Sequence, residues 1–169
     1  MSQQQEASEH AMTTRIGQAV ILHRGGDREE ARNRLAGLWQ ELGTDGDLLH
    51  RCTVAHYMAD TQEDPEAELE WDLRALAAAD ALAGEQATGE QATGEEQALV
   101  VRSFYPSLYL SLAADHLKLR DGAAARRELD RTRGALGELG ELDDDEYGAG
   151  IQAAIERLER RLGEELPQE

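Results

Sequence analysis

The sequence contains few of the residues on which several classes of protein depend. Its single cysteine, Cys52, excludes an intramolecular disulfide framework. Aromatic residues make up only 4% of the 169 residues, although hydrophobic residues make up 40%, so most of the apolar content is Ala and Leu. These two residues form helices readily, whereas strands draw on β-branched and aromatic side chains. The composition therefore predicts an all-α protein.

Basic residues and long apolar runs are also scarce. The chain has 17 Lys and Arg against 35 Asp and Glu, and its net charge of −18 would repel nucleic-acid phosphates and anionic membrane surfaces. No segment approaches the roughly 20 apolar residues that cross a bilayer. Residues 1–14 lack the basic and apolar parts of a secretory signal. We therefore expect a cytoplasmic protein with no nucleic-acid or membrane partner.

Apolar residues recur at helical spacing along most of the chain, between breaks made by Gly, Asp and Pro. We expect one domain over residues 12–163, between a disordered N-terminus at 1–11 and a disordered tail at 164–169. The expected helices cover about residues 13–24 (starting at Thr13 or Thr14), 27–42, 98–119 and 123–139, with two more within 47–79 and a seventh after the acidic turn at 141–146.

Three segments depart from this pattern. Residues 84–96 repeat the unit GEQAT and carry nothing to bury, so we expect a flexible low-complexity insertion. Pro106 predicts a bend in the helix over 98–119, because its ring obstructs the preceding turn. The acidic run at 63–72 reads as a solvated helix face.

Aspartates mark the joints between the expected helices. Asp64 and Pro65 form an N-cap followed by a first-turn proline, and Asp27 forms a capping box with Glu30. Three segments, 26–31, 63–67 and 120–125, each place an Asp a few residues before a small Ala. The helical hairpins are therefore related to one another.

The separation of Ala31 from Ala67 is close to the ~34-residue period of tetratricopeptide repeats. Over residues 13–135 the chain resembles that family, and residues 48–82 resemble small actinobacterial members of it. The positions that match the family pattern are Ala19, Leu22, Gly26, Ala31 and Leu35 in the first hairpin and Tyr109, Leu112, Ala113 and Ala125 in the third. The sequence departs from the pattern at Arg15 and Arg51, where a large aromatic residue is usual, and no Pro closes the repeats.

The resemblance implies a right-handed α-α superhelix of three hairpins plus a C-terminal capping helix, which would carry a stripe of Ile151, Ala154, Ile155, Leu158 and Leu162. It also implies a groove, lined by the first helix of each hairpin, that would hold a protein or a peptide. The residues expected in the groove are Val20, His23, Arg24, Cys52, His56, Asp60, Tyr109 and His116.

Cys52, His56 and Asp60 are spaced four apart, so they share one face of their helix, while His50 projects to the other side. Three interpretations stay open. The row is ordinary packing around a buried Cys; or His56 and Asp60 anchor a groove ligand, with Asp60 orienting the imidazole. In the third, the row is a Cys–His nucleophile or a metal site completed by His23 or His116.

We expect a binding or scaffolding module for another protein or a peptide, acting as a monomer or homodimer, with no cofactor, no assigned metal site and no assigned catalytic residue. The alternative is a small-molecule-binding protein or enzyme that uses Cys52, His56 and Asp60. A third class is a regulator that senses peptides, since an acidic groove favours basic ones.

Overall fold

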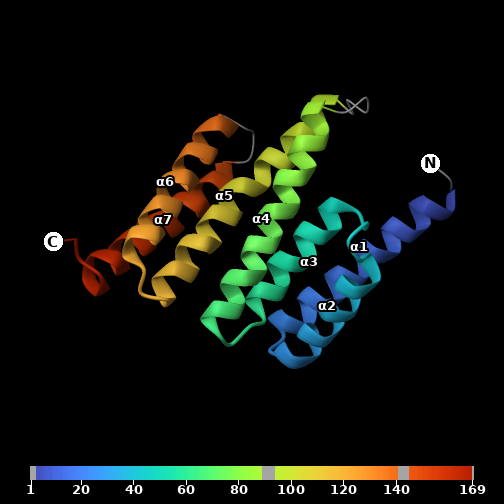
Figure 1. Cartoon of the computed structure of the whole chain (residues 1–169), viewed down its shortest axis with the longest axis horizontal. Coiled ribbons are helices and arrows are strands. Elements are labelled where there is room, and N and C mark those ends of the chain that lie inside the picture. The colour runs from blue at the N-terminus through green and yellow to red at the C-terminus, as the bar shows by residue number, and fades with distance from the viewer. Residues whose placement is uncertain (1–2, 89–93, 141–144, 169) are drawn as a thin grey trace. The chain divides into compact units, whose positions relative to one another are not determined.

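The computed structural model describes residues 3–88, 94–140 and 145–168, which form seven helices and no strand (Figure 1). The helices are α1 (Gln3–Arg24), α2 (Arg28–Leu42), α3 (Leu48–Asp60), α4 (Pro65–Thr88), α5 (Gly94–Lys118), α6 (Gly122–Leu139) and α7 (Asp145–Glu165). The predicted all-α class is confirmed. Within the described ranges, no helix combines the length and the apolar character that a membrane crossing requires.

Several helices extend past their predicted ends. α1 begins at Gln3 rather than at Thr13 or Thr14, because residues 3–11 contain no Gly or Pro and are rich in helix-forming Gln, Glu and Ala. α4 extends into the start of the GEQAT segment, and α5 begins within its end. The middle of the segment, residues 89–93, lies outside the described residues. α7 likewise runs to Glu165, inside the predicted tail.

The chain divides into two compact units, residues 1–78 and 79–169, with the boundary inside α4. The single domain expected over residues 12–163 stays a prediction. In the first unit, α1, α2 and α3 contact one another. Trp39 of α2 meets Trp71 of α4 edge to face, with the ring centroids 5.1 Å apart. The buried core of this unit consists of Ile16, Ala19, Leu35, Leu38, Val54 and Met58.

In the second unit α5 packs against α6 and α7, and α6 contacts α7. Its core consists of Ala113, Leu117, Ala125, Leu129, Ile151, Ile155, Leu158 and Leu162. The last four are members of the predicted stripe on α7, which therefore faces α5 and α6. Pro106 is buried within α5, which continues through it as one helix. Tyr147 of α7 donates its hydroxyl to the Ser103 carbonyl, 2.7 Å away, one turn before the proline.

Four helices begin at an aspartate whose carboxylate accepts a backbone N–H three residues later. The pairs are Asp27 to Glu30 (3.3 Å), Asp47 to His50 (3.0 Å), Asp64 to Ala67 (3.3 Å) and Asp121 to Ala124 (3.1 Å). The predicted N-caps Asp27 and Asp64 are confirmed. Each cap satisfies a backbone donor that the first turn leaves unpaired.

The turns before α2 and before α6 have the same geometry. Gly26 and Arg120 both adopt positive φ, at 95° and 64°. Their N–H groups bond to the carbonyls three residues earlier, and the N–H groups of Asp27 and Asp121 bond five residues back. This is the Schellman arrangement that closes a helix end. The α1–α2 and α5–α6 hairpins therefore have the same type of connecting turn, even though Arg120 must adopt a conformation that suits Gly better.

Candidate functional site

Cys52 lies in the core of the first unit. Its side chain is 2% exposed, and burial raises the pKa of the thiol to about 11. A thiolate, not a thiol, is the nucleophile and the metal ligand. A thiol held protonated in this way is inert at neutral pH, so the position of Cys52 fits the packing interpretation of the row.

The three members of the predicted row lie in different environments. Asp60 is exposed at the end of α3, whereas His56 has 27% of its side chain exposed and turns its Nδ1 inward. The carboxylate beside that nitrogen belongs to Asp72 of α4, whose Oδ1 lies 3.5 Å from His56 Nδ1. Asp72 is 3% exposed, so the prediction that it belongs to a solvated acidic face is wrong. It is Asp72, from the neighbouring helix, that flanks the imidazole.

His56 and Asp72 have counterparts in the other two hairpins, at the same distances along the chain from the N-cap. Counting eight residues back from the caps Asp27, Asp64 and Asp121 gives Ala19, His56 and Ala113; counting eight forward gives Leu35, Asp72 and Leu129. Ala19 and Leu35 share the core of the first unit, and Ala113 and Leu129 share that of the second. The middle hairpin therefore has a His–Asp pair where the other two have a buried Ala and a buried Leu of one core.

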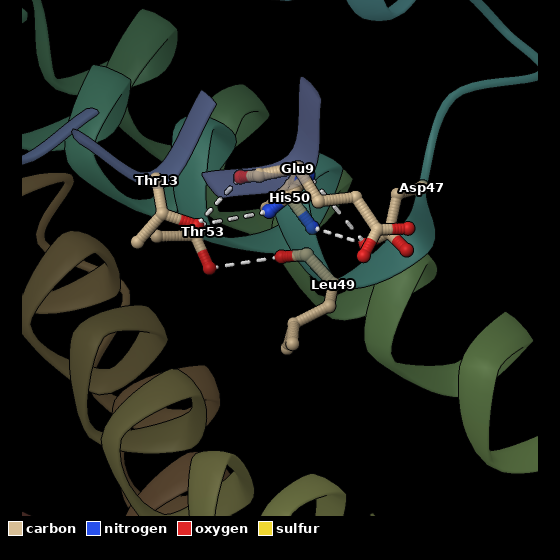
Figure 2. Close-up of polar contacts among 6 residues, drawn as sticks. All are labelled: Glu9, Thr13, Asp47, Leu49, His50 and Thr53. Carbon is tan, nitrogen blue, oxygen red and sulfur yellow. Dashed lines mark hydrogen bonds and ion pairs between the residues drawn. The ribbon is translucent and has the colours of Figure 1, made fainter. Parts of the chain in front are cut away.

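His50 lies apart from the row, as predicted, and contacts α1 (Figure 2). Its Nε2 lies 3.4 Å from the Thr13 hydroxyl, which itself donates to the Glu9 carbonyl at 3.0 Å (Figure 2). The Thr13 hydroxyl thus lies within hydrogen-bonding distance of both the Glu9 carbonyl and the His50 ring. His50 Nδ1 lies 3.8 Å from the Asp47 carboxylate. His50 thus ties α1 to the start of α3.

The remaining predicted residues do not gather around the row in a metal-binding arrangement. Val20 packs against the core of the first unit, His23 is half-buried near the end of α1, and Arg24 is exposed. His116 belongs to the second unit, where it is half-buried. Among the described residues, no three His, Cys, Asp or Glu side chains are grouped so that they could hold a metal ion.

Tyr109, by contrast, lines a hollow of about 380 Å³ in the second unit. The residues around it come from the end of α4, from α5 and from α6: Asp80, Tyr105, Tyr109, Arg131, Gly134, Ala135 and Glu138. We call this hollow the tyrosine site. Its size falls within the ~300–1,000 Å³ range typical of ligand pockets.

Two tyrosines form one wall of the tyrosine site. The rings of Tyr105 and Tyr109 lie 5.7 Å apart at an angle of 31°, and Tyr105 donates its hydroxyl to Asp80 Oδ1 at 2.7 Å. Arg131 approaches from α6, with its guanidinium carbon 5.9 Å from the Tyr109 ring centroid. Its Nη1 donates to Glu128 Oε1 at 3.1 Å. The arginine is thereby held at one edge of the site.

The pKa of the Tyr109 hydroxyl reflects the charges around the site. Burial raises the pKa of its hydroxyl, the carboxylate of Asp80 raises it further, and those of Glu128 and Glu138 act in the same direction. Arg131 alone opposes them. Three carboxylates and one guanidinium therefore act on a single phenol, which stays protonated and neutral.

A second hollow, of about 500 Å³, lies between α6 and α7, and its charged groups contact one another. Arg133 pairs with Asp130 at 3.3 Å and also with Glu159. Arg126 donates to the Leu166 carbonyl at 2.6 Å. The charged residues that line this hollow are balanced, two arginines against two carboxylates, whereas the tyrosine site is lined by two carboxylates, one arginine and two aromatic rings. The tyrosine site is therefore the stronger candidate for a ligand.

Sequence reasoning selected Tyr109 but missed Asp80, Arg131 and Glu138. The spacing of Tyr105 and Tyr109 places both on one helix face, and that of Arg131 and Glu138 does the same on α6. Those two signals were readable. What brings Asp80 to them is the packing of α4 beside α5, which no local pattern encodes.

No protein-family model matches the chain, and no curated protein or solved structure is significantly similar to it.

Proposed function

We propose that the chain is a helical repeat protein of the tetratricopeptide type that binds another protein or a peptide. In this proposal the α1–α2, α3–α4 and α5–α6 hairpins are the repeats of a right-handed superhelix, and α7 is the capping helix. Each hairpin alone has an apolar face that it cannot bury, and stacking repeats supplies the missing core.

The observation that carries this proposal is the common plan of the hairpins. The turns before Asp27 and Asp121 make the same hydrogen bonds, and Ala19 and Leu35 occupy the same positions relative to the cap as Ala113 and Leu129. Two segments so far apart in the sequence adopt the same turn and bury the same residue types, as expected of duplicated units.

The binding role is supported by the character of the tyrosine site. It combines aromatic rings, a half-buried phenol and carboxylates in a hollow, whereas Cys52 is a buried, protonated thiol with no activating neighbour described around it. Aromatic residues are enriched at the centres of protein interfaces, where they supply large rigid contacts.

Selection of a random-peptide library on the immobilised chain tests the proposal. We expect enriched peptides that bind in solution with micromolar or tighter affinity, and a Tyr105→Ala/Tyr109→Ala variant that loses at least tenfold in affinity. The matched control is Tyr57→Ala, which removes a half-buried tyrosine of the first unit. If no enriched peptide binds the folded chain in solution, or if the control loses as much affinity as the tyrosine-site variant, the proposal is wrong.

A further inference from the structure

We infer that the tyrosine site binds the guanidinium group of an arginine side chain in a basic peptide segment. The inference rests on the proposed function and names the partner chemistry of the same site. It follows from the balance of charge in the site, the available aromatic surface and the placement of Arg131.

The charged groups around the site are unequal in number. Asp80, Glu128 and Glu138 are acidic, and Arg131 is the one base among the residues described around the hollow. The whole chain carries a net charge of −18, so its overall field also favours cations. A site of this kind raises the local concentration of cations and repels anions.

Arg131 leaves the outer part of the site to a ligand. Its Nη1 is bonded to Glu128, which is 7% exposed, and Glu128 Oε2 is buried without another hydrogen-bond partner. Moving Arg131 away would leave that carboxylate both buried and unpaired, which is costly. The arginine therefore neutralises Glu128, while Asp80 and Glu138 remain to attract a second cation.

The aromatic wall selects a flat cation. The electron-rich faces of Tyr105 and Tyr109 attract positive groups within about 6 Å, and a guanidinium stacks on such faces while it donates to carboxylates in its own plane. Asp80 already accepts one hydrogen bond from Tyr105, but a carboxylate has about four acceptor positions. An arginine side chain can thus stack on the tyrosines and donate to Asp80 and Glu138.

The test uses the full chain and three fluorescein-labelled peptides of Gly and Ser that differ at a central pair of residues: arginine, lysine or citrulline. Citrulline has nearly the shape of arginine without its charge. By fluorescence anisotropy we expect the arginine peptide to bind at least tenfold more tightly than the citrulline peptide and more tightly than the lysine peptide. Its affinity should fall as salt is added.

Two variants localise the binding. Asp80→Asn/Glu138→Gln should weaken the arginine peptide at least tenfold. Glu156→Gln/Glu164→Gln, which removes the same charge from exposed positions on α7, should change its affinity less than twofold. Far-UV circular dichroism checks that both variants keep their helix content.

Equal affinity for the arginine and citrulline peptides would overturn the inference, and so would equal losses in the two variants. Agmatine, a free guanidinium compound, separates a peptide site from a small-molecule site: competition by agmatine at the concentration of the peptide itself would overturn the assignment to a peptide. If library peptides bind while the arginine peptide does not, this inference fails and the proposed function stands. If no peptide binds, both fail.

Discussion

Replacing His56 and Asp72 together by Ala and Leu should leave the first unit at least as stable as it is now. This double change gives the middle hairpin the residues found at the equivalent positions of the other two, Ala19 with Leu35 and Ala113 with Leu129. Buried polar and ionic pairs often contribute less than apolar residues of similar size, because both groups lose their hydration.

The two single substitutions show how large a change in the free energy of unfolding to expect. His56→Ala removes the imidazole that lies 3.5 Å from the buried Asp72 carboxylate, and removing one partner of a buried pair costs about 3–5 kcal/mol. His56 is partly exposed, so we expect the lower end of that range. Asp72→Leu gains about 1.5–3 kcal/mol of apolar burial but strands the buried Nδ1 of His56, so its net effect is small. The double variant keeps the gain without the stranded group.

Urea unfolding followed by tryptophan fluorescence measures these effects selectively. The two tryptophans of the chain, Trp39 and Trp71, both lie in the first unit. His50→Ala is the matched control, since it removes another half-buried imidazole from α3 and should cost about 1 kcal/mol for its weak hydrogen bond. A double variant less stable than the unchanged chain would refute the reasoning, because Ala and Leu would then not replace the pair at this position.

Three further predictions follow from the described contacts. Alkylation of Cys52 should be at least about a hundredfold slower in the folded chain than in urea at pH 8, because burial raises the pKa of the thiol from its ordinary value of 9.0 to about 11. Since the folded state favours the protonated thiol, the contribution of Cys52 to stability, measured in urea titrations against Cys52→Ala, should be constant below pH 9 and fall by up to about 2.7 kcal/mol as pH rises through 11; fast native labelling would contradict this. Trp71→Ala removes the edge-to-face partner of Trp39 and should cost about 3 kcal/mol by the fluorescence of the remaining tryptophan, whereas a loss below about 1 kcal/mol would argue against the contact. Asp121→Ala should destabilise the second unit by about 1 kcal/mol by circular dichroism, and Asn at the same position should restore most of it unless the cap is unimportant.

The sequence predicts local features of the fold well. Asp27 and Asp64 were recognisable as caps because capping depends on one side chain and the backbone three residues later. α1 starts earlier than apolar periodicity predicts, since residues 3–11 have helix propensity but no apolar stripe. Helix ends set by propensity alone are therefore the least predictable.

The sites are less predictable because they depend on contacts between helices. Asp60 follows His56 by one helical turn, so local geometry favoured it as the partner of the imidazole. The residue beside the imidazole is instead Asp72 on the next helix. Asp72 belongs to an acidic run, and the charge of that run alone predicts that it is exposed to solvent, whereas Asp72 is buried. The tyrosine site depends in the same way on a contact between two helices, the hydrogen bond from Tyr105 of α5 to Asp80 of α4.

Comparing the hairpins at equal distances from their N-caps gives information that a single helix does not. Within its own helix, Asp72 looks like one more acidic residue in a run that contains several. Relative to the cap it stands where Leu35 and Leu129 are buried, and only that comparison marks it as a charge at a core position. If the hairpins are repeats, as we propose, each hairpin is a reference for the others, and the His56–Asp72 pair departs from its counterparts. Because a buried Ala and a buried Leu occupy the corresponding positions in the other two hairpins, stability alone does not account for the pair.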